Sequence, residues 1–324
     1  MMKFLLTVAI PTYKRPDFLF SCLTSVYQSI RGEPVEVLVM DDSTDSTNDN
    51  VKKAFSKAVW ISNKKNLGID GNICACVKNA SADYVWLIGE DDLMRNDSIY
   101  KALDVIRSNK GYSFIFANYS YITADHKRVL RSKSIDIESG PMLFQKFFEN
   151  YLWSAGFIGG CIINRSKFLA TDYNEFIGTY YAHVAGICLS SVGTEIYTIS
   201  EPSVGNRVGD ASTFTWSDDS FGVFQGWRVL LLRLKSVFGE KSFDRSYVSH
   251  TAAHGYLNVK FLMNKKADGG LGEIYRCSTK NPLVESVERI KISFVHYFIP
   301  RFFCRYARAV YARFRRRNLL PFSK

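Results

Sequence analysis

The feature that most constrains this chain is a buried-strand pattern that ends in three consecutive carboxylates. Residues 84–88 read Tyr-Val-Trp-Leu-Ile, an apolar and β-prone run, and Gly89 separates them from Glu90, Asp91 and Asp92. Ligands of α/β proteins gather where parallel strands end. Adjacent acids repel one another unless a cation lies among them, and Mg²⁺ or Mn²⁺ prefers carboxylate oxygen and often binds a substrate's phosphates as well. The segment therefore predicts a site for a metal ion and a diphosphate, although an isolated E-D-D would more simply be a solvated turn.

The chain before residue 120 alternates strand and helix patterns. Strands interleaved with helices predict an α/β fold with a mostly parallel central sheet and right-handed crossovers. Continuous apolar runs predict buried strands at 4–10, 35–40, 58–62, 84–88 and 112–118, and helical spacing of apolar residues predicts helices at 17–29, 48–56, 71–80 and 97–108.

Two further strands of this predicted sheet end in polar residues. Asp41 and Asp42 follow the second strand, and Pro11-Thr12-Tyr13 ends the first. Because open α/β sheets bind ligands at such ends, these residues are expected beside the acidic triplet. No G-x-G-x-x-G follows the first strand, which disfavours a dinucleotide fold, and the chain contains no G-x-x-x-x-G-K-[ST] phosphate loop.

Four linked motifs in this order resemble the family 2 glycosyltransferases of GT-A fold. They are V-A-I-P-T-Y-K-R-P at 8–16, V-L-V-M-D-D-S-T-D-S-T at 37–47, N-L-G-I-D-G-N at 66–72 and A-D-Y-V-W-L-I-G-E-D-D at 82–92. The resemblance covers roughly residues 4 to 120. It implies a nucleotide-sugar donor and a divalent cation, Mg²⁺ or Mn²⁺.

The resemblance also implies roles for individual residues. Glu90-Asp91-Asp92 takes the place of the D-x-D motif, with Asp92 as the metal ligand and with Asp91 and Glu90 beside the diphosphate and the sugar. Asp42 is similar to the acid that reads the base edge. The residues that would line the nucleotide pocket are Pro11, Thr12, Tyr13, Asn66, Gly68 and Asn72. Glu90 departs from the family pattern, which usually has a smaller residue or Asp there.

A shorter stretch of the second half resembles the abequosyltransferase-type O-antigen glycosyltransferases. The matching residues are 173–184, 199–202, Arg207 and Asp210. Such enzymes move a 3,6-dideoxyhexose from a CDP-sugar to a lipid-linked oligosaccharide. The resemblance favours surface-polysaccharide synthesis, with Arg207 at the donor diphosphate, while UDP-, GDP- and dTDP-sugars stay open as donors.

The catalytic base is expected near residue 180. Many family members carry an E-D pair after an F-I-G-like turn, but this chain has Thr179-Tyr180 there. His183, one helical turn later, could take the acceptor proton because imidazole titrates near neutrality. The alternative is that His183 is a buried core residue. Asp210, Glu175 and Asp172 are the other candidates for the base. We expect an inverting mechanism, with Asp91 also in the reaction centre.

The C-terminal region is basic and aromatic. From 289 to 324 there is no Asp or Glu, and arginines alternate with Phe and Tyr. On a helix beginning near Pro300, Phe302, Phe303 and Tyr306 would form an apolar stripe beside arginines. That composition is typical of an interfacial helix on an anionic membrane, whereas a packed helix with a solvated basic face is the alternative. Binding to nucleic acid is the weaker option, since no RNA or DNA module is visible.

Composition and motif positions together predict the organisation and location of the chain. Its 324 residues are 47% hydrophobic, carry a net charge of +11 and include seven scattered cysteines, which we interpret as reduced thiols of a cytoplasmic protein. We expect a nucleotide-sugar-binding half at 1–120, an acceptor-binding half of the same domain at 121–215 and a helical region at 216–324. The basic tail would make the protein peripheral on the inner face of the cell membrane.

Two rival functions remain at this point. A nucleotidyltransferase would share the α/β layout and the acidic metal site, but it usually needs a glycine-rich phosphate loop that P-T-Y-K-R does not provide. A non-catalytic sugar- or membrane-binding scaffold would explain the missing E-D pair. Turnover of a nucleotide sugar would separate these hypotheses.

Overall fold

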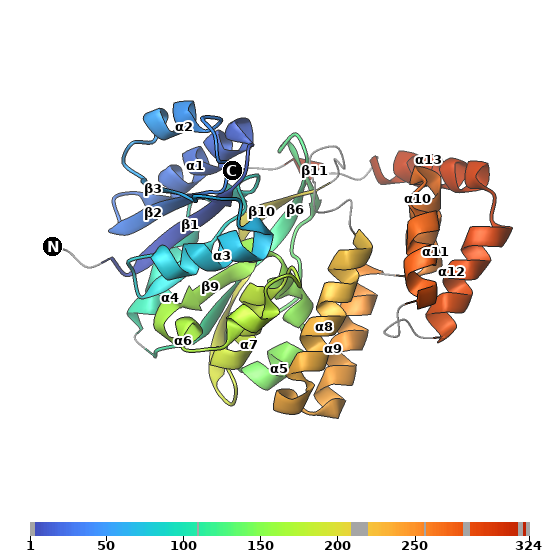
Figure 1. The fold of residues 1–324 in the computed structure, drawn as a ribbon. Helices are drawn as coiled ribbons and strands as arrows, with labels where there is room; N and C mark the ends of the chain where they lie inside the picture. The colour runs from blue at the N-terminus through green and yellow to red at the C-terminus, as the bar shows by residue number, and fades with distance from the viewer. Residues whose placement is uncertain are drawn as a thin grey trace.

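The computed structural model describes residues 4–108, 110–208, 220–255, 257–280, 286–316 and 320–321. Its centre is a mixed β-sheet, and its C-terminal third is helical (Figure 1). The strands are β1 (Leu6–Thr12), β2 (Val35–Asp41), β3 (Val59–Ser62), β4 (Tyr84–Leu87), β5 (Leu93–Met94), β6 (Phe114–Thr123), β7 (Arg128–Arg131), β8 (Gly140–Leu143), β9 (Cys161–Asn164), β10 (Glu195–Val208) and β11 (Leu320–Pro321).

Helices pack around the sheet, and a further group of helices follows β10 in the chain. Those interleaved with the strands are α1 (Pro16–Ile30), α2 (Asp49–Ala54), α3 (Gly68–Asn79), α4 (Ser98–Arg107), α5 (Phe144–Asn150), α6 (Arg165–Leu169) and α7 (Ala182–Ser190). The C-terminal helices are α8 (Ser220–Phe238), α9 (Glu240–His254), α10 (Val259–Asp268), α11 (Leu271–Lys280), α12 (Ser286–Phe298) and α13 (Arg301–Arg316). Short 3₁₀ turns span Leu152–Gly156, Ile158–Gly160 and Tyr173–Phe176.

The sheet confirms the predicted α/β class. Strands β3, β2, β1 and β4 are neighbours in that order and run parallel, with Leu6 paired to Val35 and Tyr84. Strand β9 lies antiparallel between β4 and β6, so the sheet is mixed beyond β4. Every residue of β1 except Pro11 is buried, as expected for a strand covered on both faces.

Two predictions that the sequence makes for the second half are wrong in detail. The sequence predicts a helix from Gly140 to Tyr151, but the helix begins only at Phe144, because residues 140–143 form β8 and pair with the start of β10. It also predicts a loop from 202 to 212 that holds Arg207, but the chain is strand as far as Val208. An irregularity between Ile199 and Val204 interrupts the pairing of β10 with β6, which then resumes, so tertiary pairing overrides the local turn signal of Pro202.

The buried apolar residues form two cores. The larger core surrounds the sheet and includes Trp227, Leu230 and Leu234 of α8. A smaller core within the C-terminal helices contains Leu262, Ile274, Ile292 and Val295, together with Phe224 of α8. Figure 1 shows the α8–α9 hairpin between the sheet and the group formed by α10 to α13. No described helix is both long enough and apolar enough to cross a membrane.

Candidate active site

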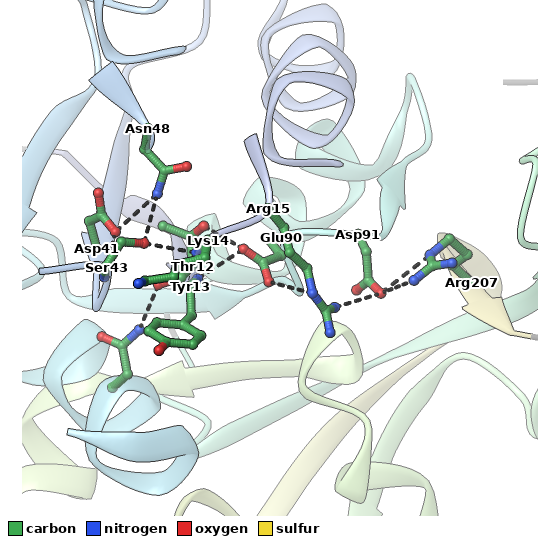
Figure 2. A network of polar contacts seen from close by, with 11 residues as sticks. Thr12, Tyr13, Lys14, Arg15, Asp41, Ser43, Asn48, Glu90, Asp91 and Arg207 are labelled. Atoms are coloured by element: carbon green, nitrogen blue, oxygen red, sulfur yellow. Dashed lines mark hydrogen bonds and ion pairs between the residues drawn. The ribbon is translucent and has the colours of Figure 1, made fainter. Parts of the chain in front are cut away.

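The carboxyl ends of three neighbouring parallel strands bring the predicted polar residues to one edge of the sheet. Thr12 ends β1, Asp41 ends β2, and the acidic triplet follows β4. Figure 2 shows a continuous chain of polar contacts along this edge, from Asn48 and Asp41 through Thr12 and Glu90 to Asp91 and Arg207. The sheet order therefore joins residues that lie up to 195 positions apart in the chain, from Thr12 to Arg207.

Glu90 is held by the end of β1. The Thr12 hydroxyl and the Tyr13 backbone N–H, the latter at 3.0 Å, both donate to Glu90 Oε2. Arg15 Nε lies 3.7 Å from Glu90 Oε1. Burial raises the pKa of Glu90 to about 7, against the lowering effect of these hydrogen bonds. The Glu90 side chain, which is longer than that of Asp, thus reaches the end of β1.

Asp91 is paired with two arginines. Its Oδ2 accepts from Arg207 Nη2 at 2.8 Å and from Arg207 Nε at 3.3 Å, and Arg15 Nη1 lies 3.6 Å away (Figure 2). Arg207 is 2% exposed, and its guanidinium lies 4.2 Å from the ring centroid of Phe18. Arg207 was expected on a loop but belongs to β10, which fixes its position against the acid.

Asp92 is the most enclosed of the three acids. Its Oδ1 accepts the Arg207 backbone N–H at 2.9 Å. Burial, and then the neighbouring Asp91, raise the pKa of Asp92. Gly89 makes the packing possible, because a Cβ there would lie 2.4 Å from Asp92 Oδ2. The glycine before the triplet is therefore a steric requirement of this arrangement.

Asp42 is engaged by the loop that leads into α3. Its two carboxylate oxygens accept N–H groups from Leu67 and Gly68 at 2.9–3.1 Å and the Asn63 side-chain amide at 3.0 Å. Asn66 Oδ1 accepts the Gly68 N–H at 2.7 Å. Gly68 has a φ of +71°, a conformation that glycine adopts without strain. The expected nucleotide residues Asp42, Asn66 and Gly68 thus form one hydrogen-bonded unit.

The other expected nucleotide residues differ in accessibility. Asn72 is buried and joins strand ends, because its Nδ2 donates to Met40 O at 3.1 Å and its Oδ1 accepts from Asn63. Thr12 is buried, Pro11 is half-buried and Tyr13 is 43% exposed. Tyr13 is therefore the aromatic ring at this edge that a ligand can reach.

His183 lies in the core and not on an accessible surface, so its expected role as the catalytic base does not fit its surroundings. It is 1% exposed, and its Nε2 is 3.1 Å from the carbonyl oxygen of Ala155. Burial lowers its pKa to about 4, although the nearby Asp70 opposes this shift. Of the other candidates, Asp172 and Glu175 are exposed, and Asp210 lies outside the described residues.

Sequence reasoning missed Asp70, which anchors the segment before α7. Its Oδ2 accepts the N–H groups of Gly178 and Tyr180, both at 2.8 Å, and its Oδ1 accepts that of Ala182 at 3.0 Å. Tyr180 has a φ of +68°, which is unusual for a residue with a side chain. The position of Asp70 inside the N-L-G-I-D-G-N motif was the available signal.

Arg15 and His126, for which no sequence motif predicted a role, also contact the triplet. Arg15 follows P-T-Y-K at the start of α1, and its side chain faces Glu90 and Asp91. His126 comes from the turn between β6 and β7, where its Nε2 lies 3.2 Å from the carbonyl oxygen of Asp91. Neither motif spacing nor periodicity pointed to these contacts, since both join segments far apart in the chain.

The acidic triplet suits a hard cation in its donor chemistry but does not form a complete cage. All its donors are carboxylate oxygens, which Mg²⁺ and Mn²⁺ prefer. Among the described residues, no group of three or more His, Cys, Asp and Glu side chains is arranged to hold a metal ion. A cation here would therefore complete its coordination with ligand phosphate oxygens and water, which is usual for Mg²⁺.

Comparison with known proteins finds a family model and a related protein that are both named for the transfer of a sugar. The model of glycosyl transferase family 2 matches residues 7–171. Abequosyltransferase RfbV of Salmonella typhimurium strain LT2 is 25% identical over 229 residues, which is 65% of this chain and 68% of the relative.

Solved structures share the fold at lower sequence identity. The crystal structure of S. aureus TarS 1-349 has a TM-score of 0.58 and 14% identity, and the match covers 90% of this chain and 87% of that one. The same protein in complex with UDP-GlcNAc has a TM-score of 0.59 and 15% identity, with 89% and 79% covered. These likenesses concern the fold, whereas the family match covers half of the chain and includes β1, β2, β4 and the acidic triplet. The chain therefore belongs to glycosyl transferase family 2 and is a glycosyltransferase of GT-A fold.

Proposed function

We propose that this glycosyltransferase moves a sugar from a nucleotide diphosphate-sugar to a lipid-linked oligosaccharide in the synthesis of a bacterial surface polysaccharide such as O-antigen. The observation that carries the proposal is the acidic triplet, flanked by Arg15 and Arg207, at the carboxyl ends of β1, β2 and β4. Similarity to an abequosyltransferase supports a dideoxyhexose donor, for which a CDP-sugar is the first candidate. The lipid-linked acceptor would place the enzyme on the inner face of the cell membrane.

The nucleotide is expected against the ends of β1 and β2. The exposed ring of Tyr13 offers a surface on which a base can stack. Pro11, Thr12 and Asn72 would support that wall, and Asn66 and Gly68 would shape it toward the ribose. Because the Asp42 carboxylate is already engaged by three residues of the loop, we propose that Asp42 affects base recognition by fixing this loop.

The diphosphate is expected beside the two arginines. A guanidinium group binds phosphate through two parallel hydrogen bonds, and both Arg15 and Arg207 are within ion-pair distance of Asp91. We propose that the donor diphosphate takes up part of this positive charge, while Asp91 and Asp92, with Glu90 beside them, would hold Mg²⁺ or Mn²⁺. Such an ion, when bound, stabilises the negative charge of the leaving diphosphate.

An inverting reaction needs a group that takes the acceptor proton. We propose a carboxylate for this role in place of the enclosed His183. Asp210 is the first candidate, since it follows Arg207 by three residues in the chain, and Asp172 and Glu175 are the exposed alternatives. A carboxylate close to the attacking hydroxyl can contribute about 10²–10⁴-fold to the rate.

A thermal-shift panel tests the donor assignment. The full chain is heated with CDP, UDP, GDP or dTDP, each with and without Mn²⁺. A ligand that binds only the folded state raises the unfolding midpoint by mass action. We expect one nucleotide to raise it most, CDP if the dideoxyhexose donor is correct, with a further increase on adding Mn²⁺.

Matched variants show whether the shift comes from this site. Arg207→Ala and Asp91→Asn should both reduce the shift, and Asp91→Asn should also remove the part that depends on Mn²⁺. Asp97→Asn changes an acid of the exposed Asp97–Lys101 pair, away from the strand ends, and should leave the shift unchanged. The proposal fails if no nucleotide shifts the midpoint, or if all three variants respond like the unmodified chain.

A further inference from the structure

Helix α12 has an apolar face that the described residues leave largely exposed. Its outward residues are spaced three, four, three and one positions apart, which places them on one side of a helix. They are between 53% and 74% exposed: Val287, Ile290, Phe294, Tyr297 and Phe298. Single exposed apolar residues are ordinary, but a whole helix face of large side chains marks an interaction surface.

The opposite side of α12 already supplies the local core. Ile292 and Val295 are fully buried there, in the smaller apolar cluster. Glu288 is buried on the same side, where its Oε2 lies 3.0 Å from Arg228 Nη1 and its Oε1 accepts the Tyr247 hydroxyl at 2.9 Å. The helix is therefore apolar on two faces, and only one of them is buried among the described residues. On the outward face Tyr297 also contacts α11, where its hydroxyl donates to the Tyr275 hydroxyl at 3.0 Å.

Helix α13 continues the pattern beyond Pro300. It is attached to the end of α10 by one side, where Cys304 is buried and where Arg301 and Arg305 donate to the carbonyl oxygen of Ala267. The first residues on its other side are 50–75% exposed: Phe302, Phe303 and Tyr306. The apolar faces of α12 and α13 are joined by two residues, Ile299 and Pro300, and we call them together the α12–α13 aromatic surface.

Apart from Glu288, the charged side chains of α12 and α13 are all basic, and Arg308 of α13 pairs with Asp268 at the end of α10. From residue 289 to the end of the sequence there is no Asp or Glu, and Glu288 is neutralised within the protein by Arg228. Lys291 and Arg305 are exposed on the two helices. Bulky apolar side chains bordered by basic residues fit the boundary between acyl chains and anionic headgroups, since the rings enter the apolar layer and the cations remain with the phosphates.

We propose that the α12–α13 aromatic surface docks the protein on an anionic phospholipid bilayer. The surface begins at Val287, so it is not confined to the basic end of the chain. This proposal rests on the membrane location proposed above. Because vesicle binding can be measured without sugar transfer, membrane docking and sugar transfer can be tested separately. Deleting residues 300–324 would remove the α13 part and the contacts of Arg301 and Arg305 with α10, but it would keep the five exposed residues of α12.

The test is co-sedimentation of the full chain with vesicles. One set contains phosphatidylcholine and phosphatidylglycerol, and the other contains phosphatidylcholine alone. We expect binding to the anionic vesicles, partly reduced by added salt because salt screens the charges and not the apolar contacts. The triple variant Phe294→Ser, Phe298→Ser and Phe302→Ser should bind about tenfold or more weakly, since it removes three of the side chains that would enter the bilayer.

A matched control changes three exposed apolar residues elsewhere in the chain: Tyr100→Ser, Leu143→Ser and Val192→Ser. This variant should bind like the unmodified chain, and both variants should keep the nucleotide-dependent thermal shift, which shows that the folded site survives. Equal sedimentation of the two variants would overturn the proposal. So would a dimer in solution that the Phe294, Phe298 and Phe302 substitutions convert to a monomer, because the surface would then contact a second copy of the chain.

Discussion

At the scale of single residues, the site depends on close packing around the acidic triplet. Asp92 is almost enclosed, and both of its neighbours in the triplet are held by segments from other parts of the chain. Small changes in backbone or side-chain volume here should affect ligand binding before they affect folding, because the cluster lies at the edge of the sheet and not within its apolar core.

Gly89→Ala should displace Asp92 and weaken nucleotide binding in the presence of Mn²⁺ by about tenfold or more. The added Cβ would meet Asp92 Oδ2 at 2.4 Å and Asp91 Oδ1 at 3.3 Å, and contacts this close force a shift. Titration calorimetry with the nucleoside diphosphate checks the affinity. Gly272→Ala adds a methyl group where the nearest atom is 4.0 Å away, and it should bind normally. An unchanged affinity in Gly89→Ala would show that Asp92 is not needed where we place it.

Asp70→Asn should loosen the segment before α7 and cost roughly 1–3 kcal/mol of local stability. The carboxylate accepts three backbone N–H groups, whereas the amide would direct donor hydrogens at some of them. Hydrogen exchange of the Tyr180 and Ala182 amides should become faster. Asp172→Asn, at an exposed acid of the preceding turn, is the control and should leave that exchange rate unchanged.

At the scale of elements, a buried ion pair connects the helical units. Arg228 of α8 and Glu288 of α12 are each 10% exposed at the side chain, and Tyr247 of α9 donates to the same glutamate. Three helices thus meet at one carboxylate, next to the boundary between the two apolar cores. This contact, together with the small apolar core, fixes the orientation of the outward face of α12.

Glu288→Ala should destabilise the packing of α12 on α8 by about 3–5 kcal/mol, because it leaves the Arg228 charge buried without its carboxylate. Urea unfolding and limited proteolysis between α11 and α12 measure the effect. The double variant Arg228→Met and Glu288→Met should recover much of the loss, since neither charge remains. Glu240→Ala removes an exposed pair with Lys235 and should change nothing measurable. If Glu288→Ala behaves like Glu240→Ala, the pair does not hold the helices together.

At the scale of the whole molecule, buried neutral histidines tie folding to pH. His183 and His250 are both 1% exposed, and burial lowers the pKa of each. Asp70 opposes the shift at His183, and His254 adds to it at His250. His183 lies on α7 in the large core, and His250 lies on α9, where its ring stacks on Trp227 of α8, so the effect concerns both parts of the chain.

The free energy of unfolding should fall as the pH is lowered from about 6.5 toward 4. The pKa of His183 is about 4 in the folded protein, whereas an unfolded histidine has a pKa of about 6.5. In that window the unfolded chain binds more protons, so the stabilisation is fully present above the unfolded value and is lost as the pH approaches the folded one. For His183 alone the loss is on the order of 3 kcal/mol.

Urea unfolding at several pH values measures this dependence. His183→Asn should flatten the curve in the same window, because the variant has no proton to gain at that position. If His183→Asn keeps the full slope of the unfolding free energy against pH, other groups cause the acid sensitivity.

The sequence by itself determined the class of the fold and indicated where along the chain the candidate site lies. Strand and helix periodicity depends on neighbouring residues, so it predicted β1, β2 and β4 closely, and glycine followed by three acids marked the end of a strand. Linked motifs of the first half indicated the family, which the comparisons confirm.

Only the tertiary structure decided which residues complete that site and which faces stay open. Arg207 meets Asp91 across 116 positions, and Asp70 meets the segment before α7 across 108 to 112, distances over which local patterns carry no information. His183 looked like a base at its motif position, yet packing encloses it. Helix α12 is apolar on two sides, so its sequence could not say which side would be covered. Contacts with Arg228 and with the small core turn Glu288, Ile292 and Val295 inward and leave Ile290, Phe294 and Phe298 outside.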